Sequence, residues 1–260
     1  MKFPILLVLF PVLLFSVPVY AEYNTVTNRD EPVNTSTEQE VALGDSIAKQ
    51  IEKQYKVSED KHMQERVELI GNRLAKVCDR KDLIYHFKVL DINDINAVSL
   101  PGGWVYIFKG LITKCKNDDE LAGVIAHEIG HICARHAIKQ QQTSSIMNIA
   151  MIAAALAGGG QGAQATSLAL TSLMAAYSRE DEFEADRRAV IYTKKAGYDP
   201  YALVTFMQTM HEAEKFQVRP YSYFRSHPYE GERIGNINRQ INGTMDFKGW
   251  INKPLDRDKW

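Results

Sequence analysis

The feature that most constrains this chain is the stretch from Asn117 to His136, which the residue pattern predicts to be one helix. Asn117 suits an N-cap, Glu120 follows at capping-box spacing, and the aspartates between them suit the positive end of the helix dipole. At about 3.6 residues per turn, His127 and His131 project from one face and can both reach a single ion. We therefore expect a metal site on this helix.

Glu128 completes a His-Glu-x-x-His pattern with these two histidines. It lies about 100° around the helix from His127, so it is placed to reach a water on the open side of the ion rather than to bind the ion. Imidazole pairs suit zinc, and zinc lowers the pKa of a bound water toward about 7. We expect one Zn²⁺ per chain, with Glu128 as general base. The alternative is a buried helix whose histidines only form hydrogen bonds. His136, about 140° from His131, is expected to be structural.

A catalytic zinc needs a third protein ligand, and the segment from Ser178 to Val190 is the best source. Glu182 and Asp186 are four residues apart, so on a helix Glu182 can bind the ion while Asp186 accepts a hydrogen bond from a metal-bound histidine. The competing interpretation is that Ser178 caps this helix and the acids only suit its positive end. Glu182 is preferred over Glu184, and a shifted register would reverse that choice.

Residues 1–21 have the pattern of a secretory signal peptide: one basic residue, Lys2, then an apolar run that ends at Ala21. The alternative, a retained membrane anchor, needs about 20 uninterrupted apolar residues, whereas prolines break this run. We expect cleavage after Ala21 and export. The predicted organisation is then a flexible leader over 22–37, one domain over 38–242 and a polar tail over 243–260.

The remaining pattern predicts a mainly helical α+β domain with a small sheet beside the metal helix. Helices are expected over 36–57, 60–78 and 198–210 from their apolar spacing, and strands over 83–91 and 103–109 from their β-branched and aromatic content. Pro101-Gly102-Gly103 forms a turn between the strands. A plain hairpin explains the glycines as well as any role in binding does.

Charge and cysteine content exclude several classes of protein. The formal net charge is −1, so neither nucleic acid nor an anionic membrane is indicated as a partner. The three cysteines lack CxxC spacing, which argues against a cysteine zinc site or a disulfide scaffold. A bridge between Cys78 and Cys115 is one option, and Cys133 is expected to be a small buried apolar residue.

The tract over 144–177 is rich in Met, Ala and Gly. Each half is too short to span a bilayer at about 1.5 Å per residue, so we expect a helical hairpin that turns at Gly158-Gly159-Gly160. Core packing is the default interpretation. A lid over the cleft and a peripheral contact with a membrane surface are the alternatives.

Taken together, these segments resemble the zinc metallopeptidase family of the CAAX prenyl proteases and the heat-shock peptidase HtpX, above all its soluble exported bacterial branch, which includes BepA and LoiP. The motifs that carry the resemblance are Asn96-Ala97 with Leu100-Pro101-Gly102-Gly103, His127-Glu128-Ile129-Gly130-His131, Tyr177-Ser178-Arg179 with Glu182-Phe183-Glu184-Ala185-Asp186, and Ser226-His227-Pro228 with Glu232-Arg233.

The resemblance implies a zincin-like fold with Glu182 as third ligand and Asp186 behind the ligands. It favours an exposed strand, Gly103, Trp104, Val105 and Tyr106, that binds substrate by backbone pairing. It also implies that His227 approaches the zinc, either to stabilise the reacting oxyanion or to fill the open position in a closed state. Arg233 is expected to hold that loop.

The expected activity is that of an exported zinc metalloendopeptidase in the periplasm, with membrane association as an option, whose partners are unfolded or misassembled cell-envelope proteins. One rival is a metal-binding chaperone or adaptor that holds such proteins without cutting them, although it would have no need of Glu128. A second rival is an enzyme that acts on a non-peptide amide or ester.

Overall fold

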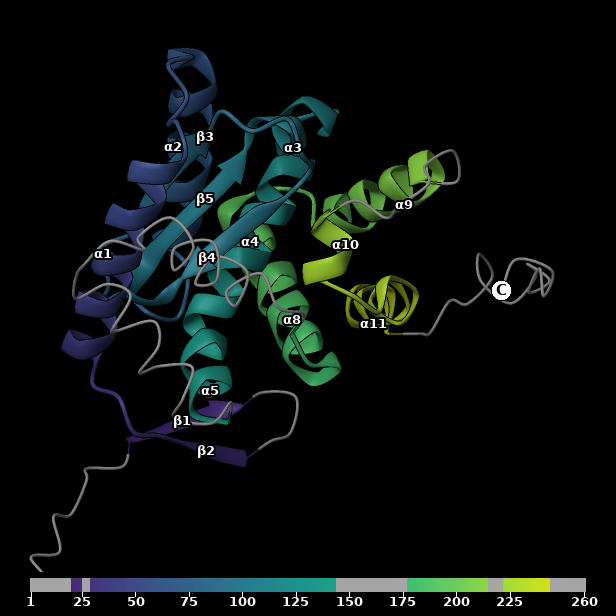
Figure 1. The fold of residues 1–260 in the computed structure, drawn as a ribbon. Coiled ribbons are helices and arrows are strands. Elements are labelled where there is room, and N and C mark those ends of the chain that lie inside the picture. The colour runs from purple at the N-terminus through teal and green to yellow at the C-terminus, as the bar shows by residue number, and fades with distance from the viewer. Residues whose placement is uncertain (1–19, 25–28, 144–176, 215–221, 244–260) are drawn as a thin grey trace, which may run out of the picture.

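A computed structural model of the chain describes residues 20–24, 29–143, 177–214 and 222–243 (Figure 1). Its architecture is mainly helical, with a three-stranded sheet and a separate two-stranded β1–β2 sheet, which confirms the predicted fold class. The elements are β1 (Tyr20–Asn24), β2 (Arg29–Val33), α1 (Thr37–Gln54), α2 (Lys61–Ala75), β3 (His86–Leu90), β4 (Ala97–Leu100), the 3-10 turn η1 (Pro101–Gly103), β5 (Trp104–Phe108), α3 (Lys109–Lys114), α4 (Asp118–Cys133), α5 (His136–Thr143), α8 (Arg179–Ala196), α9 (Ala202–Glu214), α10 (Ser222–Ser226) and α11 (Glu230–Asn242).

The central sheet has the strand order β3-β5-β4, with β3 parallel to β5 and β4 antiparallel to β5. The turn η1 connects β4 to β5, and Gly102 and Gly103 have φ of 76° and 103° there. A Cβ on Gly102 would lie 2.6 Å from the Cα of Val41, so the turn packs directly on α1. The hairpin is therefore β4–β5. The two strands predicted from sequence, over 83–91 and 103–109, correspond to β3 and β5, which are parallel neighbours.

The sheet buries both of its faces. Side chains alternate across a strand, so Val105 and Ile107 of β5 join the large core formed with α2, α4, α8 and α9. Tyr106 and Phe108 point the other way and pack with Ile47 of α1 in a second, smaller core. Figure 1 shows α1 lying along one side of the sheet and α4 on the other. The sheet thus separates α1 from the metal helix.

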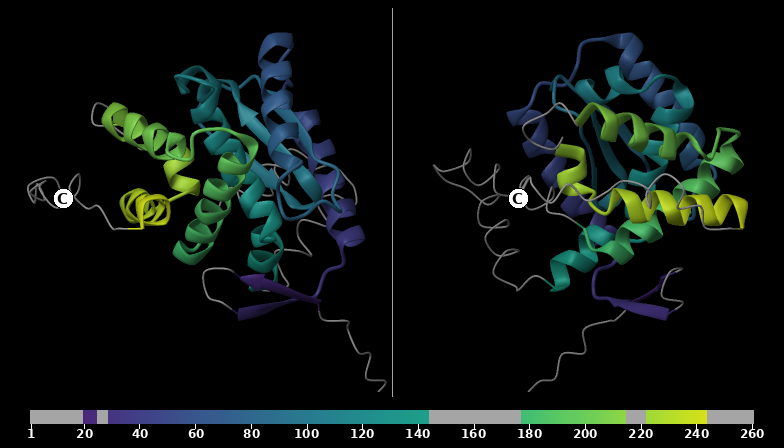
Figure 2. Two further views of the ribbon diagram at one scale, coloured as in Figure 1. Left: turned by 180° about the vertical axis from the view of Figure 1, so that it is seen from behind. Right: turned by 90° about the vertical axis from the view of Figure 1, so that its right-hand side faces the viewer.

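Helix α4 is the centre of the larger core, and every residue from Glu120 to Cys133 is buried. Helices α8, α9, α10 and α11 lie together on the side of α4 away from α1 (Figures 1 and 2). Two glycines let neighbours approach α4 closely. A Cβ on Gly130 would lie 2.8 Å from the carbonyl oxygen of Ala185 in α8, and one on Gly123 would lie 2.9 Å from the amide nitrogen of Leu203 in α9.

A buried ion cluster ties α1 to the end of α4. The Glu40 carboxylate, 1% exposed, accepts hydrogen bonds from Arg80 at 2.8 and 2.9 Å and from the Gly102 amide at 3.2 Å. Arg135, which follows α4, lies 2.9 Å from the same carboxylate. A buried carboxylate is tolerated only when it is paired in this way. Glu40 therefore holds the η1 turn against the metal helix, a role that the sequence did not indicate.

Several predicted features lie outside the described residues: nearly all of the signal peptide, the tract over 144–176 and the tail from 244 onward. Strand β1 begins at Tyr20, at the end of the predicted signal peptide, and pairs with β2 of the predicted leader in antiparallel register, Tyr20 opposite Val33. None of the helices in the described part is both long and apolar enough to cross a membrane.

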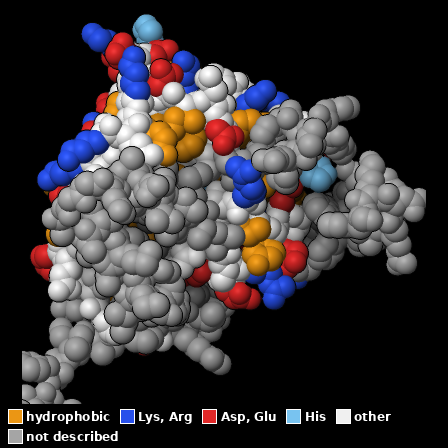
Figure 3. Space-filling view, in the orientation of Figure 1, with side chains coloured by type: hydrophobic (Ala, Val, Ile, Leu, Met, Phe, Trp, Pro, Cys, Tyr) orange, Lys and Arg blue, Asp and Glu red, His pale blue; other side chains and the backbone are white. Residues whose placement is uncertain are grey.

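Charged side chains of both signs are interspersed over the described surface on the face shown in Figure 3, in keeping with the near-balance of charge in the sequence.

We predict that Gly130→Ala and Gly123→Ala each lower the free energy of unfolding by about 1–3 kcal/mol, because the added methyl group overpacks a helix contact. The sign of this change distinguishes the two effects. Alanine is a better helix former than glycine by about 1 kcal/mol, so without the overpacking it would stabilise α4. Urea unfolding followed by circular dichroism measures the change. An unchanged or raised midpoint would contradict the close packing of α8 and α9 on α4.

Candidate metal centre

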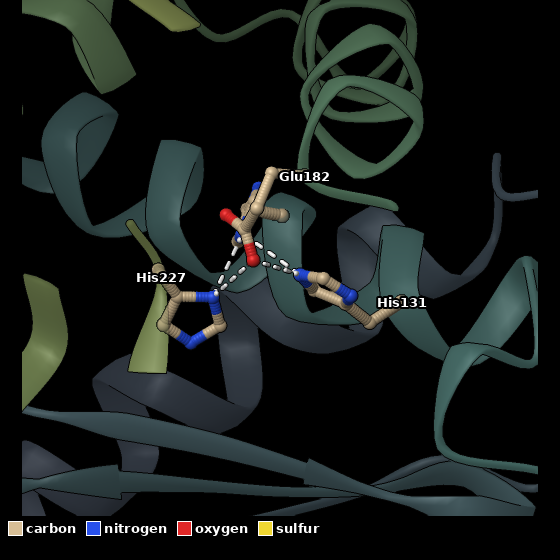
Figure 4. Close-up of side chains that lie close together, drawn as sticks. His131, Glu182 and His227 are labelled. Carbon is tan, nitrogen blue, oxygen red and sulfur yellow. Dashed lines mark hydrogen bonds and ion pairs between the residues drawn. The ribbon is translucent and has the colours of Figure 1, made fainter. Parts of the chain in front are cut away.

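Four buried side chains from three segments converge on one point: His127 and His131 of α4, Glu182 of α8, and His227 after α10. The Nε2 atoms of His127 and His131 are 3.0 Å apart, and carboxylate oxygens of Glu182 lie 3.4 and 3.5 Å from them, respectively. The Nδ1 atom of His227 lies 3.3 Å from Nε2 of His127 and 3.1 Å from Glu182 (Figure 4). This is a donor set of three imidazoles and one carboxylate.

Local capping sets the register of both helices. Asn117 accepts a hydrogen bond from the Glu120 amide at 2.9 Å and begins α4, while Ser178 and Asp181 form a capping box that begins α8. In that register Glu182 faces α4. Capping therefore accounts for Ser178 and Asp181, whereas Glu182 of the same acidic segment faces the donor cluster and stays the candidate ligand.

Asp186 supports His127 from behind. Its Oδ1 lies 2.9 Å from Nδ1 of His127, which directs Nε2 of that ring toward the cluster. Arg233, fully buried, donates to both oxygens of Asp186 at 2.8 and 2.7 Å. The same guanidinium lies 2.8 Å from Glu182 and donates to the carbonyl oxygen of His227 at 3.2 Å. Arg233 therefore holds the His227 loop, as expected, and also pairs with the two carboxylates of α8.

His131 has its own support on the opposite side. Nδ1 of His136 lies 2.8 Å from Nδ1 of His131, and Nε2 of His136 lies 3.3 Å from Glu184. Glu184 pairs in turn with Arg188 at 2.9 Å. The Tyr177 ring stacks on His131 with its centroid 4.0 Å away. Glu184, the other ligand candidate in the sequence, thus faces His136 rather than the donor cluster.

Glu128 lies beside the cluster without joining it. Its side chain is fully buried, and neither oxygen has a hydrogen-bond partner within the described segments. The nearest ionisable contact is Nε2 of His227, 3.4 Å from Oε1. A buried carboxylate without hydrogen bonds is costly, so this geometry suits a group that acts on a water or a substrate.

Buried opposite charges shift the pKa values in this centre. Burial alone would raise the pKa of Glu182, but the charge of Arg233 and then that of His227 hold it well below the usual range. Arg233 likewise lowers the pKa of Asp186 against the effect of burial. Burial and the nearby His127 lower the pKa of His131. Ionised carboxylates and a neutral imidazole are the forms that bind a divalent cation.

The expected substrate strand needs correction. We predicted that Gly103, Trp104, Val105 and Tyr106 belong to an exposed strand, but β5 is the central strand and pairs on both sides. Gly103 belongs to the η1 turn. The edge strand on the antiparallel side is β4, which packs against α4. The prediction was wrong because parallel pairing of β3 with β5 joins segments that are distant in sequence.

Two residues, Tyr177 and His136, contact the candidate ligand His131, although the sequence analysis did not predict this contact for either of them. Tyr177 belongs to a motif quoted above, but the motif does not say that its ring covers a histidine. His136 was expected to be structural, and its place behind His131 gives that role a specific form. A search for a polar partner for each metal-facing histidine would have singled it out.

Comparison with known proteins agrees with this geometry. The model of peptidase family M48 matches residues 61–241. The chain is 27% identical over 214 residues to the beta-barrel assembly-enhancing protease of Escherichia coli K12, a match that covers 78% of this chain and 44% of that protein. It is 31% identical over 180 residues to Metalloprotease YcaL of the same organism, covering 66% of this chain and 70% of the relative.

Metalloprotease LoiP of Escherichia coli K12 is 29% identical over 180 residues, which covers 68% of this chain and 69% of the relative. The chain spans about half the length of the beta-barrel assembly-enhancing proteases that it matches. The family match itself extends over most of the chain and includes all four converging side chains and Glu128. This chain therefore belongs to peptidase family M48.

Proposed function

We propose that this chain is a zinc-dependent endopeptidase that cuts unfolded or misassembled proteins of the cell envelope after its own export. The observation that carries the proposal is the convergence of His127, His131 and Glu182 on one point, with the Glu128 carboxylate, which has no hydrogen bond within the described residues, beside it. An adaptor that only holds its partners has no use for that carboxylate.

The donor separations fit zinc. Ligand atoms at about 2.0–2.1 Å from a tetrahedral ion are about 3.3 Å apart. The three separations among His127, His131 and Glu182 are 3.0, 3.4 and 3.5 Å. Two imidazoles and a carboxylate are also a known ligand set of catalytic zinc. These three residues would hold the ion, and Asp186 and His136 would orient the two rings.

Glu128 would carry the proton in the reaction. Zinc held by His127, His131 and Glu182 would supply Lewis-acid chemistry to the scissile carbonyl and would make a water nucleophilic near neutral pH. Glu128 accepts the proton of the attacking water and delivers it to the leaving amine, so the tetrahedral carbon loses its nitrogen as a neutral amine. Full burial of Glu128 excludes bulk water from this transfer.

The edge of β4 would bind the substrate backbone. The Phe108 amide donates to the Asn96 carbonyl at 3.0 Å, which marks Asn96 and Phe108 as a hydrogen-bonded pair. Because such pairs alternate, the N–H and C=O groups of Ala97 and Ser99 point away from β5. An extended peptide that adds to this edge would lie along α4.

We further propose that the arrangement described here is a closed one. A catalytic zinc keeps one position open, whereas Nδ1 of His227 lies where a fourth ligand would be. Ser99 is only 4% exposed, and Tyr177 bonds through its amide to the carbonyl of Ser226 beside this edge. His227 would leave the centre before a substrate binds, which makes it a gate.

Export, a periplasmic location, membrane association and the choice of envelope proteins as substrates are part of the same proposal. They rest on the signal-peptide pattern of residues 1–21 and on the printed names of relatives such as the beta-barrel assembly-enhancing protease.

We expect Glu128→Gln to retain zinc and to lose at least about 10²-fold in cleavage of casein, because the amide cannot accept the proton. Fragments are counted by mass spectrometry, and zinc by atomic absorption. Cleavage at the wild-type rate would refute the role of Glu128. A wild-type protein that binds unfolded outer-membrane protein and leaves it intact would instead favour the adaptor.

We expect Asp186→Asn to weaken zinc binding by about 10- to 100-fold, since the amide is a poorer acceptor for Nδ1 of His127. Competition with a chromophoric chelator measures the affinity. Asp82→Asn is the matched control, because it removes a carboxylate that pairs with Arg80 outside the centre. Equal affinities for the two variants would rule out the proposed support of His127.

We expect Ser99→Pro to lower kcat/KM for peptides by about threefold to tenfold, the worth of one backbone hydrogen bond. Proline is tolerated on an edge strand where the N–H points outward, so the fold should persist. Ser99→Ala also removes the hydroxyl but keeps the amide N–H, and it should retain most of the activity. Equal activity of the two variants would place the substrate elsewhere.

A further inference from the structure

Two of the three cysteines meet in the core, away from the proposed chemistry. Cys78 follows α2 and Cys133 ends α4, and they are 1% and 0% exposed. Their sulfur atoms contact the same hydroxyl, that of Tyr85, at 3.3 and 3.5 Å. The neighbouring Cys133 is also the largest cause of a raised pKa at Cys78.

Cys115 stands apart from this pair. It caps the end of α3, and burial, followed by the charge of Glu120, raises its pKa to about 12. The bridge between Cys78 and Cys115 that the sequence left open is therefore not the one the fold favours. Cys78 has Cys133 as its sulfur neighbour.

We propose that Cys78 and Cys133 are joined by a disulfide when the chain folds in an oxidising compartment. The compartment follows from the export proposed above, whereas the pairing rests on the positions of the two sulfur atoms. Both sulfurs contact one hydroxyl oxygen, so displacement of the Tyr85 hydroxyl would let them approach to the S–S bonding distance of about 2.05 Å.

The reaction is a thiol–disulfide exchange with an external disulfide as oxidant. The thiolate of one cysteine attacks the oxidant, forms a mixed disulfide and releases one thiol. The second cysteine then attacks the mixed disulfide, forms the S–S bond and releases the other thiol. The two cysteines lose two protons and two electrons, and the oxidant gains them. Because both sulfurs are buried in the finished fold, the exchange occurs during folding.

The bond would fasten the metal helix at its end. Cys133 lies two residues after His131 in α4. At the other end of the proposed bond, Cys78 directly precedes Asp79 and Arg80. Asp79 pairs with Arg188 of α8, and Arg80 pairs with Glu40 of α1. The cross-link would therefore connect the segment that contacts α1 and α8 to α4, and it would restrict the unfolded chain over a long loop.

The test uses the full chain, exported by a bacterial host and, separately, refolded from denaturant with oxidised glutathione. The unreduced protein is denatured, alkylated with N-ethylmaleimide, digested and analysed by mass spectrometry. We expect alkylation at Cys115 alone and one linked peptide that contains Cys78 and Cys133. Alkylation of all three cysteines after glutathione refolding, or a link that includes Cys115, would overturn the proposal.

Variants and a second measurement complete the test. Cys115→Ser should keep the linked peptide, and reduction should lower its Tm as it does for the wild type. Cys133→Ser should leave Cys78 alkylated, and its Tm should not respond to reductant. A Tm that responds equally in both variants would contradict the assignment. None of these measurements depends on zinc or on proteolysis. A negative result would therefore refute the disulfide without refuting the proposed peptidase function.

Discussion

The close approach of α8 to α4 at Gly130 is the constraint on which the rest of the structure depends. It brings the carboxylates of Glu182 and Asp186 to the imidazoles of α4, in a region where every one of these groups is buried. Burying an unpaired charge costs several kcal/mol. That cost is comparable to the whole free energy of unfolding of a typical domain, about 5–15 kcal/mol. The helix pair is therefore acceptable only because a compensating positive charge is packed with it.

Arg233 supplies that charge. One guanidinium contacts both carboxylates of α8, and its own pKa is raised by Asp186 and then Glu182 although burial opposes this. Two carboxylates facing one guanidinium still leave negative charge at the centre, and the imidazole of His127, which contacts both carboxylates, is their remaining partner. A divalent cation bound among these donors would complete the pairing, so metal binding and the stability of this part of the core are linked.

The sequence was informative where the interactions are local. The cap at Asn117 and the spacing of the two histidines determine α4 within one element, and the same holds for Ser178 and Glu182 in α8. Features that depend on distant segments were not accessible: the place of β5 between β3 and β4, the role of Glu40, and the contact of Cys78 with Cys133. A period of two predicts a strand, but it does not name the neighbour of that strand.

In the proposed mechanism, metal access and substrate access would be coupled through one short segment. Helix α10 is anchored to the start of β4, since the Tyr223 amide donates to the Ile95 carbonyl and the Ser226 hydroxyl donates to Asn96. His227 follows directly and reaches the donor cluster, while its amide bonds back to the Tyr223 carbonyl. A movement that withdraws His227 from the centre must therefore also disturb the contacts of α10 with the β4 edge. Under the proposed gating by His227, a single displacement would free both the fourth ligand position and the strand edge that a peptide needs.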